Sequence, residues 1–246
     1  MTVLEPATGE IQEHRTVSRV TNILELAARN SHGVRLVEIA AELDAPRSSL
    51  YGLVKGLVAN GYLRDDGGTY TIGPAISALL VARPTLERAA RVGMEKLHSE
   101  FDETVTLVSL IGDSIVYTDA IESTQAIRYN PTLRVRRPLY PTSAGKCYLA
   151  NASERFRENY LAAHTSDYAT REHIRQELRT VKEQGGAINQ GETLPELYSV
   201  SVPIFDGAHV AAVLTIAGPS ARFADRLDEL LGATKNAAHL ISSRLQ

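Results

Sequence analysis

Residues 36–63 read LVEIAAELDAPRSSLYGLVKGLVANGYL, and this stretch decides how the first part of the chain folds. Apolar residues recur at helical spacing on both sides of the short turn Asp44-Ala45-Pro46, a pattern typical of two short helices that bury one stripe each. Pro46 suits the first position of the second helix, and Asn60-Gly61 is a stop signal at its end. The positions expected to pack the two helices together are Ile39, Ala40, Leu43, Ala45, Leu50 and Leu53.

The segments on either side extend this pattern to three helices and a hairpin. Val20, Ile23, Leu24 and Ala27 mark an earlier helix, and residues 62–72, YLRDDGGTYTI, predict two short strands around a turn. Two short helices joined by a tight turn and followed by a hairpin describe a winged helix-turn-helix. In this fold the second helix of the pair enters the major groove of DNA with its N-terminal half.

The polar side of this second helix is the predicted DNA-contacting surface. Arginine can pair with guanine or phosphate, and serine and tyrosine hydroxyls usually contact phosphate. The two serines are also expected to satisfy free amides in the first helical turn. The candidate DNA-contacting residues are Arg47, Ser48, Ser49, Tyr51 and Lys55 on the helix and Arg64 at the start of the wing.

A three-helix domain whose polar face is simply hydrated is the alternative. Residues 14–72 hold seven positive and six negative charges, so their local net charge is only +1. The distribution still favours DNA binding, because cations lie on the second helix and the wing, whereas Glu38 and Glu42 lie on the preceding helix. Gly52 is open to two interpretations: it allows close approach to a phosphate, or it is a tolerated defect that costs about 1 kcal/mol relative to alanine.

Length and composition exclude several classes of protein. The chain has 246 residues, a formal net charge of −3 and a single cysteine, Cys147. One cysteine excludes a disulfide within the chain and disfavours a cysteine-based zinc site. The first residues lack the basic and apolar pattern of a signal peptide, and no apolar run is long enough to cross a bilayer. We therefore expect a cytoplasmic protein without membrane contact.

The chain is expected to divide into four parts. Residues 1–13 are expected to form a flexible tail, residues 14–73 the winged helix-turn-helix, residues 74–84 a linker helix ended by Pro84, and residues 85–246 a second domain. The second domain is expected to contain a helix over 85–101, strands on either side of Gly112-Asp113, an extended piece ending at Pro141, helices over 144–163 and 170–184, a hairpin around Asp206-Gly207 and a last helix over 222–244. Helices with antiparallel hairpins place the whole chain in the α+β class.

The second domain shows no catalytic pattern. Gly145-Lys146 is similar to the end of a phosphate-binding loop, but that motif needs glycine where Tyr140 stands and serine or threonine where Cys147 stands. No histidine lies near the cysteine in sequence, and the seven histidines are scattered without metal-ligand spacing. We therefore expect no catalytic residue, metal or cofactor. An enzyme of small-metabolite metabolism with an ancillary winged helix is the alternative, and a protein-interaction module that does not touch DNA is a third possibility.

Three segments resemble one family of bacterial transcription factors. Residues 36–63 resemble the DNA-binding segment of the isocitrate lyase regulator (IclR) family. Residues 137–150, RPLYPTSAGKCYLA, are similar to its Gly-Lys segment, and residues 199–219, SVSVPIFDGAHVAAVLTIAGP, resemble its terminal hairpin. The segments follow one another in the family's order, and the resemblance runs from about residue 14 to the end of the chain.

The resemblance implies that the second domain binds an effector. It implies a GAF/PAS-like mixed α/β domain with a curved antiparallel sheet and a pocket for a small organic ligand, often an acid. Carried onto this chain, the effector-binding positions are Ser143, Ala144, Asn189, Ser199, Thr215 and Ala217. The backbone amides of the first two lie at a helix N-terminus, which suits an anion, and the last two share one face of a strand.

Departures from the family pattern indicate a less polar pocket. Asn189 stands where members often have an acidic residue, Ala217 where they have a second hydroxyl, and Tyr140-Pro141 replaces a more usual histidine-containing pair. These changes suggest a larger or aromatic effector, unless the residues only pack the domain. Arg134, Arg136 and Arg137 could steer an anionic ligand, but a solvated edge strand accounts for them as well.

The expected function is a DNA-binding transcriptional regulator. Its expected partners are a double-stranded DNA operator, a small-molecule effector and further copies of itself, as a homodimer or homotetramer. Coupling between ligand and DNA is expected to run through the helix over 74–83, and each ligand must then change the affinity of the other by the same factor.

Overall fold

The structure is a computed structural model, and it describes residues 14–79 and 84–245. The chain divides into two compact units, Met1–Ala82 and Arg83–Gln246, which are described one at a time. The tail expected at residues 1–13 and the last part of the expected linker helix lie outside the described residues. Within the described ranges, no helix combines the length and the apolar character needed to cross a membrane.

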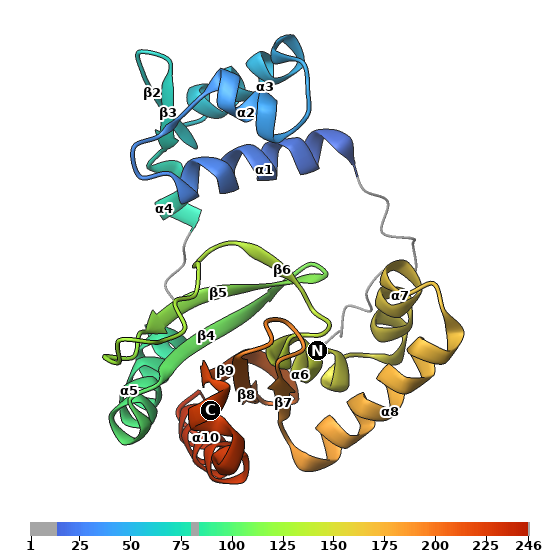
Figure 1. Ribbon diagram of the computed structural model, residues 1–246. Helices are drawn as coiled ribbons and strands as arrows, with labels where there is room; N and C mark the ends of the chain where they lie inside the picture. The colour runs from blue at the N-terminus through green and yellow to red at the C-terminus, as the bar shows by residue number, and fades with distance from the viewer. Residues whose placement is uncertain (1–13, 80–83, 246) are drawn as a thin grey trace, which may run out of the picture. The chain divides into compact units, whose positions relative to one another are not determined.

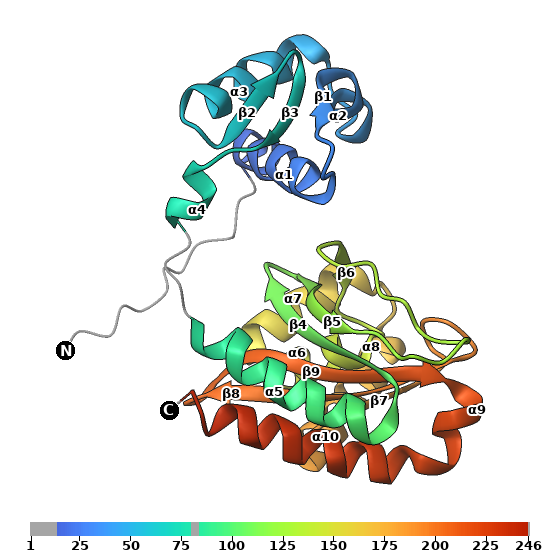
Figure 2. The same ribbon diagram turned by 90° about the vertical axis from the view of Figure 1, so that its left-hand side faces the viewer.

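The N-terminal unit is a winged helix-turn-helix (Figures 1 and 2). Its elements are α1 (Arg15–Arg29), β1 (Val34–Arg35), α2 (Leu36–Glu42), α3 (Arg47–Ala59), β2 (Leu63–Asp66), β3 (Thr69–Ile72) and α4 (Ala75–Leu79). Strand β3 pairs antiparallel with β1 and with β2, so the sheet order is β1-β3-β2. Gly67 and Gly68 turn the wing with φ of 60° and 88°, which only glycine adopts without cost.

One apolar core holds this unit together. Ile23 of α1, Ile39 of α2 and Leu50 of α3 are completely buried, and Leu63 of the wing joins them. The residues predicted to pack α2 against α3 all belong to this cluster. The helical spacing in residues 36–63 therefore identified the correct interface between the two helices.

The start of α3 differs in detail from the prediction. Pro46 is the N-cap residue, and the helix begins at Arg47. The amides of Ser49 and Leu50 donate to the carbonyl of Pro46 at 3.0 and 3.3 Å, and no side chain forms a capping hydrogen bond there. The expected capping role of Ser48 and Ser49 is therefore wrong, and both side chains are exposed.

The C-terminal unit is built on one curved antiparallel sheet. Its elements are α5 (Pro84–Phe101), β4 (Thr104–Ile111), β5 (Ser114–Ile121), β6 (Arg136–Pro138), α6 (Ser143–Asn151), α7 (Glu154–His164), α8 (Tyr168–Gln184), β7 (Ala187–Gln190), β8 (Leu197–Asp206), β9 (His209–Pro219), α9 (Ser220–Phe223), the 3₁₀ turn η1 (Ala224–Arg226) and α10 (Leu227–Ser242). The strand order is β6-β5-β4-β9-β8-β7. The predicted α+β class with a curved antiparallel sheet is confirmed.

Helices cover both faces of this sheet (Figure 2). On one face, α5 and α10 pack against alternate strand residues such as Leu107, Leu214 and Ile216. On the other face, α6, α7 and α8 form a second core with Val108 and Val213. Neighbouring residues of β4 and β9 thus face opposite cores, as the period of two requires.

Four details of this unit differ from the sequence-based expectation. The helix expected over 144–163 is two helices, because Ser153 accepts a capping hydrogen bond from the amide of Phe156 at 3.3 Å and starts α7. Pro84 is the first residue of α5. The last helix begins at Leu227, after α9 and η1. Strand β7 was not expected, because its four residues carry no strong strand pattern.

Candidate functional site

The predicted DNA-contacting residues lie on the solvent side of α3 and on the wing. Leu50, Val54 and Leu57 bury the opposite side of the helix. All six predicted residues, Arg47, Ser48, Ser49, Tyr51 and Lys55 on α3 and Arg64 on β2, are exposed. Tyr51 is 52% exposed, a high value for a large aromatic side chain.

Lys55 joins α3 to the wing. Its Nζ lies 2.7 Å from Oδ2 of Asp65 on β2, and Oδ1 of the same carboxylate accepts from the Gly68 amide at 2.8 Å. The hydrogen bond raises the pKa of Lys55 and lowers the pKa of Asp65. The Lys55 ammonium also lies 5.8 Å from the centre of the Tyr51 ring. Lys55 is therefore less available to a phosphate than Arg47, for which no ion pair is found among the described residues.

Two glycines lie on the exposed side of α3. A Cβ atom added to Gly52 or Gly56 would meet no atom of the chain within 4 Å. Neither glycine is needed for packing within this unit, although each costs about 1 kcal/mol relative to alanine in a helix. The close-approach and tolerated-defect interpretations of Gly52 both remain compatible with this geometry.

A chain of hydrogen-bonded hydroxyls joins α6 to the sheet in the C-terminal unit. Ser143 Oγ lies 2.8 Å from both Ser199 Oγ and Ser201 Oγ on β8, and Ser201 Oγ lies 2.7 Å from Thr215 Oγ1 on β9. We call these four residues the hydroxyl row. Three members were predicted effector-binding residues. Ser201 was missed, although a serine two residues after Ser199 on a strand faces the same side.

The N-terminus of α6 lies beside the hydroxyl row. Thr142 caps the helix by accepting from the amide of Gly145 at 3.0 Å. The amides of Ser143 and Ala144 find no acceptor among the described residues, and both residues are almost fully buried. Ala217 pairs in register with Ser199. Packing requires glycine at position 145, since an added Cβ would lie 1.9 Å from the carbonyl oxygen of Leu139.

The Asn189 side chain forms hydrogen bonds with two neighbouring loops. The residue is 1% exposed, its Nδ2 donates to the carbonyl of Pro141 at 2.8 Å, and its Oδ1 accepts from the amide of Glu192 at 3.1 Å. It pairs with Ser199 across β7 and β8, so it lies at the margin of the hydroxyl row. Its side chain ties the loop before α6 to the turn after β7.

The sequence did not reveal that Lys146 has a structural role. It is completely buried, and its Nζ lies 2.6 and 2.7 Å from the two carboxylate oxygens of Glu192 and 2.5 Å from Oε1 of Glu177 on α8. Tyr140 donates its hydroxyl to Glu177 at 3.1 Å. A buried ammonium must be paired, and here two carboxylates compensate it. Lys146 is therefore not available to an anionic ligand.

The remaining chemical candidates have structural roles. Cys147 is completely buried, and burial raises its pKa to about 12, which leaves no thiolate at neutral pH. Arg137 lies on β6, the edge strand of the sheet. The central carbon of its guanidinium group is 5.2 Å from the centre of the Tyr117 ring on β5. Across the part of the chain that the structure describes, no three histidine, cysteine or carboxylate side chains gather in a way that could hold a metal ion.

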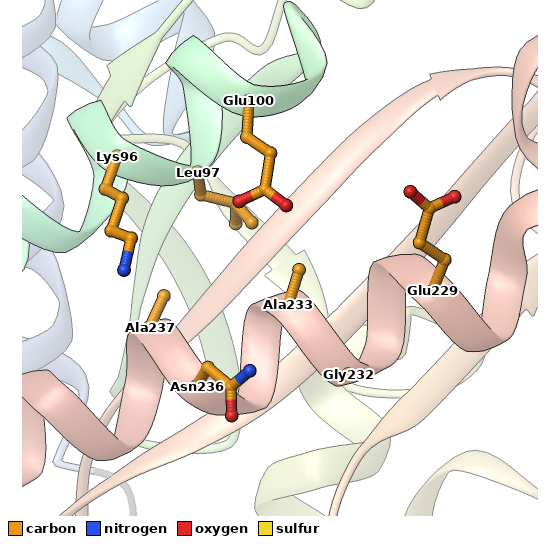
Figure 3. A pocket seen from close by; sticks show the side chains of 8 residues that line it. All are labelled: Lys96, Leu97, Glu100, Glu229, Gly232, Ala233, Asn236 and Ala237. Carbon is orange, nitrogen blue, oxygen red and sulfur yellow. The ribbon is translucent and has the colours of Figure 1, made fainter.

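A separate pocket lies between α5 and α10, on the opposite face of the sheet (Figure 3). Its volume is about 320 Å³. Glu100 of α5 and Glu229 of α10 face each other across it (Figure 3). The lining residues are Lys96, Leu97, Glu100, Glu229, Gly232, Ala233, Asn236 and Ala237. None of the predicted effector-binding residues lines this pocket.

Comparison with known proteins gives a consistent result for both units. Residues 16–67 match the IclR helix-turn-helix domain, and residues 79–243 match the bacterial transcriptional regulator IclR C-terminal domain. The HTH-type transcriptional regulator KipR of Bacillus subtilis is 28% identical over 245 residues, which cover 95% of this chain and 98% of KipR.

Solved structures show the same fold. A transcriptional regulator from Silicibacter sp. TM1040 superposes with a TM-score of 0.79 at 23% identity and covers 94% of this chain and 96% of its own. An IclR homologue from Microbacterium hydrocarbonoxydans, solved in complex with 4-hydroxybenzoate, superposes with a TM-score of 0.75 at 20% identity and covers 94% and 98% of the two chains. At these identities the likeness concerns the fold alone.

Proposed function

Because the chain belongs to the IclR family of bacterial transcriptional regulators, we propose that it binds a DNA operator through α3 and the wing, and that a small organic effector controls this binding. The family places the chain among regulators and not among enzymes. The observation that carries the proposal for DNA is the exposed polar side of α3. Arg47 and Tyr51 project from a helix whose other side closes the core, which is the presentation that a major-groove helix requires.

The proposed effector is acidic or aromatic and binds beside the hydroxyl row. The free amides of Ser143 and Ala144 at the start of α6 suit a carboxylate. The hydroxyls of Ser199 and Thr215 add neutral hydrogen-bonding groups, and Ala217 adds an apolar surface. The relative solved with 4-hydroxybenzoate supports an aromatic acid as the class of ligand.

The proposed assembly is a homodimer or homotetramer that acts in the cytoplasm. Operators of helix-turn-helix proteins repeat a half-site with two-fold symmetry, which calls for at least two copies of α3. Effector binding would change how these copies are held, through the segment over 74–83, of which the structure describes α4. Effector and operator must then change each other's affinity by the same factor.

Selection of random DNA duplexes by the purified protein tests this function. Enrichment of a palindromic or repeated half-site, with affinity that falls as salt rises, is the expected result. Absence of enrichment at every salt concentration, both alone and with aromatic acids present, would contradict the proposal. A protein-interaction role for the polar side of α3 would then be the better explanation.

A further inference from the structure

Thr106 on β4 extends the hydroxyl row by one strand. It pairs directly with Thr215 across β4 and β9, and residues directly opposite each other project from the same face of a sheet. Val108, two residues along β4, belongs to the core under α6, and so does Val213, its partner on β9. Thr106 therefore faces the side of the sheet that carries the hydroxyl row.

The Thr106 hydroxyl has no hydrogen-bond partner among the residues that the structure describes. The residue is only 1% exposed, yet Oγ1 forms no hydrogen bond with any described residue. Among the described residues, the side-chain nitrogen and oxygen atoms that are both sealed from solvent and unpaired are Arg137 Nε and Arg171 Nε. Thr106 Oγ1 is not one of them, so a small part of its surface is accessible to a water-sized molecule. A threonine hydroxyl in this position is costly unless something else binds it.

One hydroxyl proton of the hydroxyl row also lacks an acceptor among the described residues. Its four hydroxyls carry four protons, and three hydrogen bonds join them. Each bond uses one proton, so one proton of the row remains without an acceptor among the described residues. The nearby Thr104 hydroxyl is different, because it already donates to the carbonyl of Tyr129 at 2.6 Å and accepts from the amide of Ser123 at 3.2 Å.

We propose that Thr106, together with Thr215, forms a second polar contact for the effector, opposite the N-terminus of α6. This inference rests on the proposed function and adds a specificity residue that is not among the effector-binding positions implied by the resemblance. Ser143 bonds to Ser201 on β8, and β9 separates β8 from β4, so Thr106 lies about 10 Å, two strand spacings, from the strand that Ser143 contacts. A ring-sized molecule with a hydrogen bond at each end spans this distance.

The chemistry of the two ends predicts the ligand class. The free amides of α6 take an anionic group, whereas Thr106 and Thr215 carry no charge and can donate or accept. The ligand is therefore a small acid with a neutral hydroxyl or carbonyl group at its far end. Lys146 does not change this assignment, since Glu177 and Glu192 already compensate it.

Calorimetric titration of benzoate and 4-hydroxybenzoate tests the proposal. Both probes carry the acid, and only the second carries a distal hydroxyl. The unaltered protein is expected to bind 4-hydroxybenzoate about tenfold more tightly than benzoate, the worth of one hydrogen bond. Thr106→Val should abolish this preference without lowering the melting temperature, and Thr106→Ser should keep it. Thr118→Val, which removes a hydroxyl bonded to the Leu107 carbonyl on the same sheet, should leave the preference unchanged.

A crystal structure of the protein without added ligand provides an independent test of the role of Thr106. An ordered water or a retained molecule within hydrogen-bond distance of Thr106 Oγ1 is expected. Apolar side chains packed against that oxygen, or a preference for 4-hydroxybenzoate that survives Thr106→Val, would overturn the proposal. Failure of both probes to bind, with a water on Thr106, would contradict the aromatic-acid class but not the role of Thr106.

Discussion

Lys146 shows how one residue ties three segments of the C-terminal unit together. Its buried ammonium joins α6 to Glu177 on α8 and to Glu192 in the turn after β7. The same turn holds Asn189 through the Glu192 amide. The frame of the proposed effector site therefore depends on an ion pair that does not itself contact the hydroxyl row.

Replacement of Lys146 by methionine should destabilise this unit. Methionine fills a similar volume but leaves two neighbouring carboxylates without a cation. Breaking a buried pair costs about 3–5 kcal/mol, and we expect about 1–3 kcal/mol here because Glu177 and Glu192 are partly exposed and can be hydrated. Urea unfolding measures the loss. Lys182→Met, an exposed lysine of α8, is the control, and an equal effect of both substitutions would refute the role of Lys146.

Arg47 and Lys55 should contribute unequally to DNA binding. Arg47 has a charge that no described residue neutralises, whereas Lys55 is held by Asp65. We expect Arg47→Ala to weaken operator binding by about tenfold and to lower the salt slope by about 0.9, the signature of one lost phosphate contact. Lys55→Ala should weaken binding less. Fluorescence anisotropy on the selected operator measures both, and unchanged affinity in both variants would refute the assignment of α3.

At the scale of elements, the pair Lys55–Asp65 couples α3 to the wing. The lowered pKa of Asp65 means that its contribution to the pair is present above the ordinary aspartate pKa of 3.8 and is lost as the pH falls through the lowered value. The raised pKa of Lys55 means that its contribution is present below 10.5 and is lost as the pH rises beyond it. The contact is therefore insensitive to pH near neutrality.

Asp65→Asn should strengthen DNA binding. The substitution removes a negative charge beside α3 and frees Lys55, while the amide oxygen can still accept from Gly68. We expect higher operator affinity at low salt and a salt slope that is steeper by about 0.9. This gain should be constant between about pH 6 and pH 8, since neither partner titrates there. Weaker binding would instead mean that the ion pair is needed to position the wing.

At the scale of the whole molecule, each unit has an apolar core of its own. The core of the N-terminal unit contains residues of α1, α2, α3 and the wing, and the two cores of the C-terminal unit lie on opposite faces of its sheet. Such an organisation allows the units to unfold in separate steps. It also means that damage to DNA binding need not damage effector binding.

Leu50→Ala should destabilise the N-terminal unit selectively. Leu50 is completely buried in α3, and truncation of such a leucine costs about 2–5 kcal/mol. Calorimetry should show one transition at a lower temperature and a second that is unchanged. Val37→Ala, an exposed apolar residue of α2, provides the control. A single transition that shifts as a whole would contradict independent unfolding of the units.

Much of the N-terminal unit could be predicted because its rules are local. Leu50, Val54 and Leu57 lie one helical turn apart, Gly61 ends the helix with φ of 74°, and Gly67-Gly68 turns the wing. Each signal acts within a few residues. One error in the C-terminal unit was local as well. Ser153 divided an expected helix there, since a single capping serine is a weak signal amid helical spacing.

Local sequence patterns predicted the winged helix, the exposed polar side of α3 and, through the resemblance, the kind of second domain. Which side chains meet in the second domain depended on how its distant strands pair. Ser143, Ser201 and Thr215 of the hydroxyl row and the neighbouring Thr106 come from three strands and a helix, and the order β6-β5-β4-β9-β8-β7 brings them to one face of the sheet. Spacing along the chain carries no signal for such contacts, because pairing between distant strands depends on the register of the whole sheet.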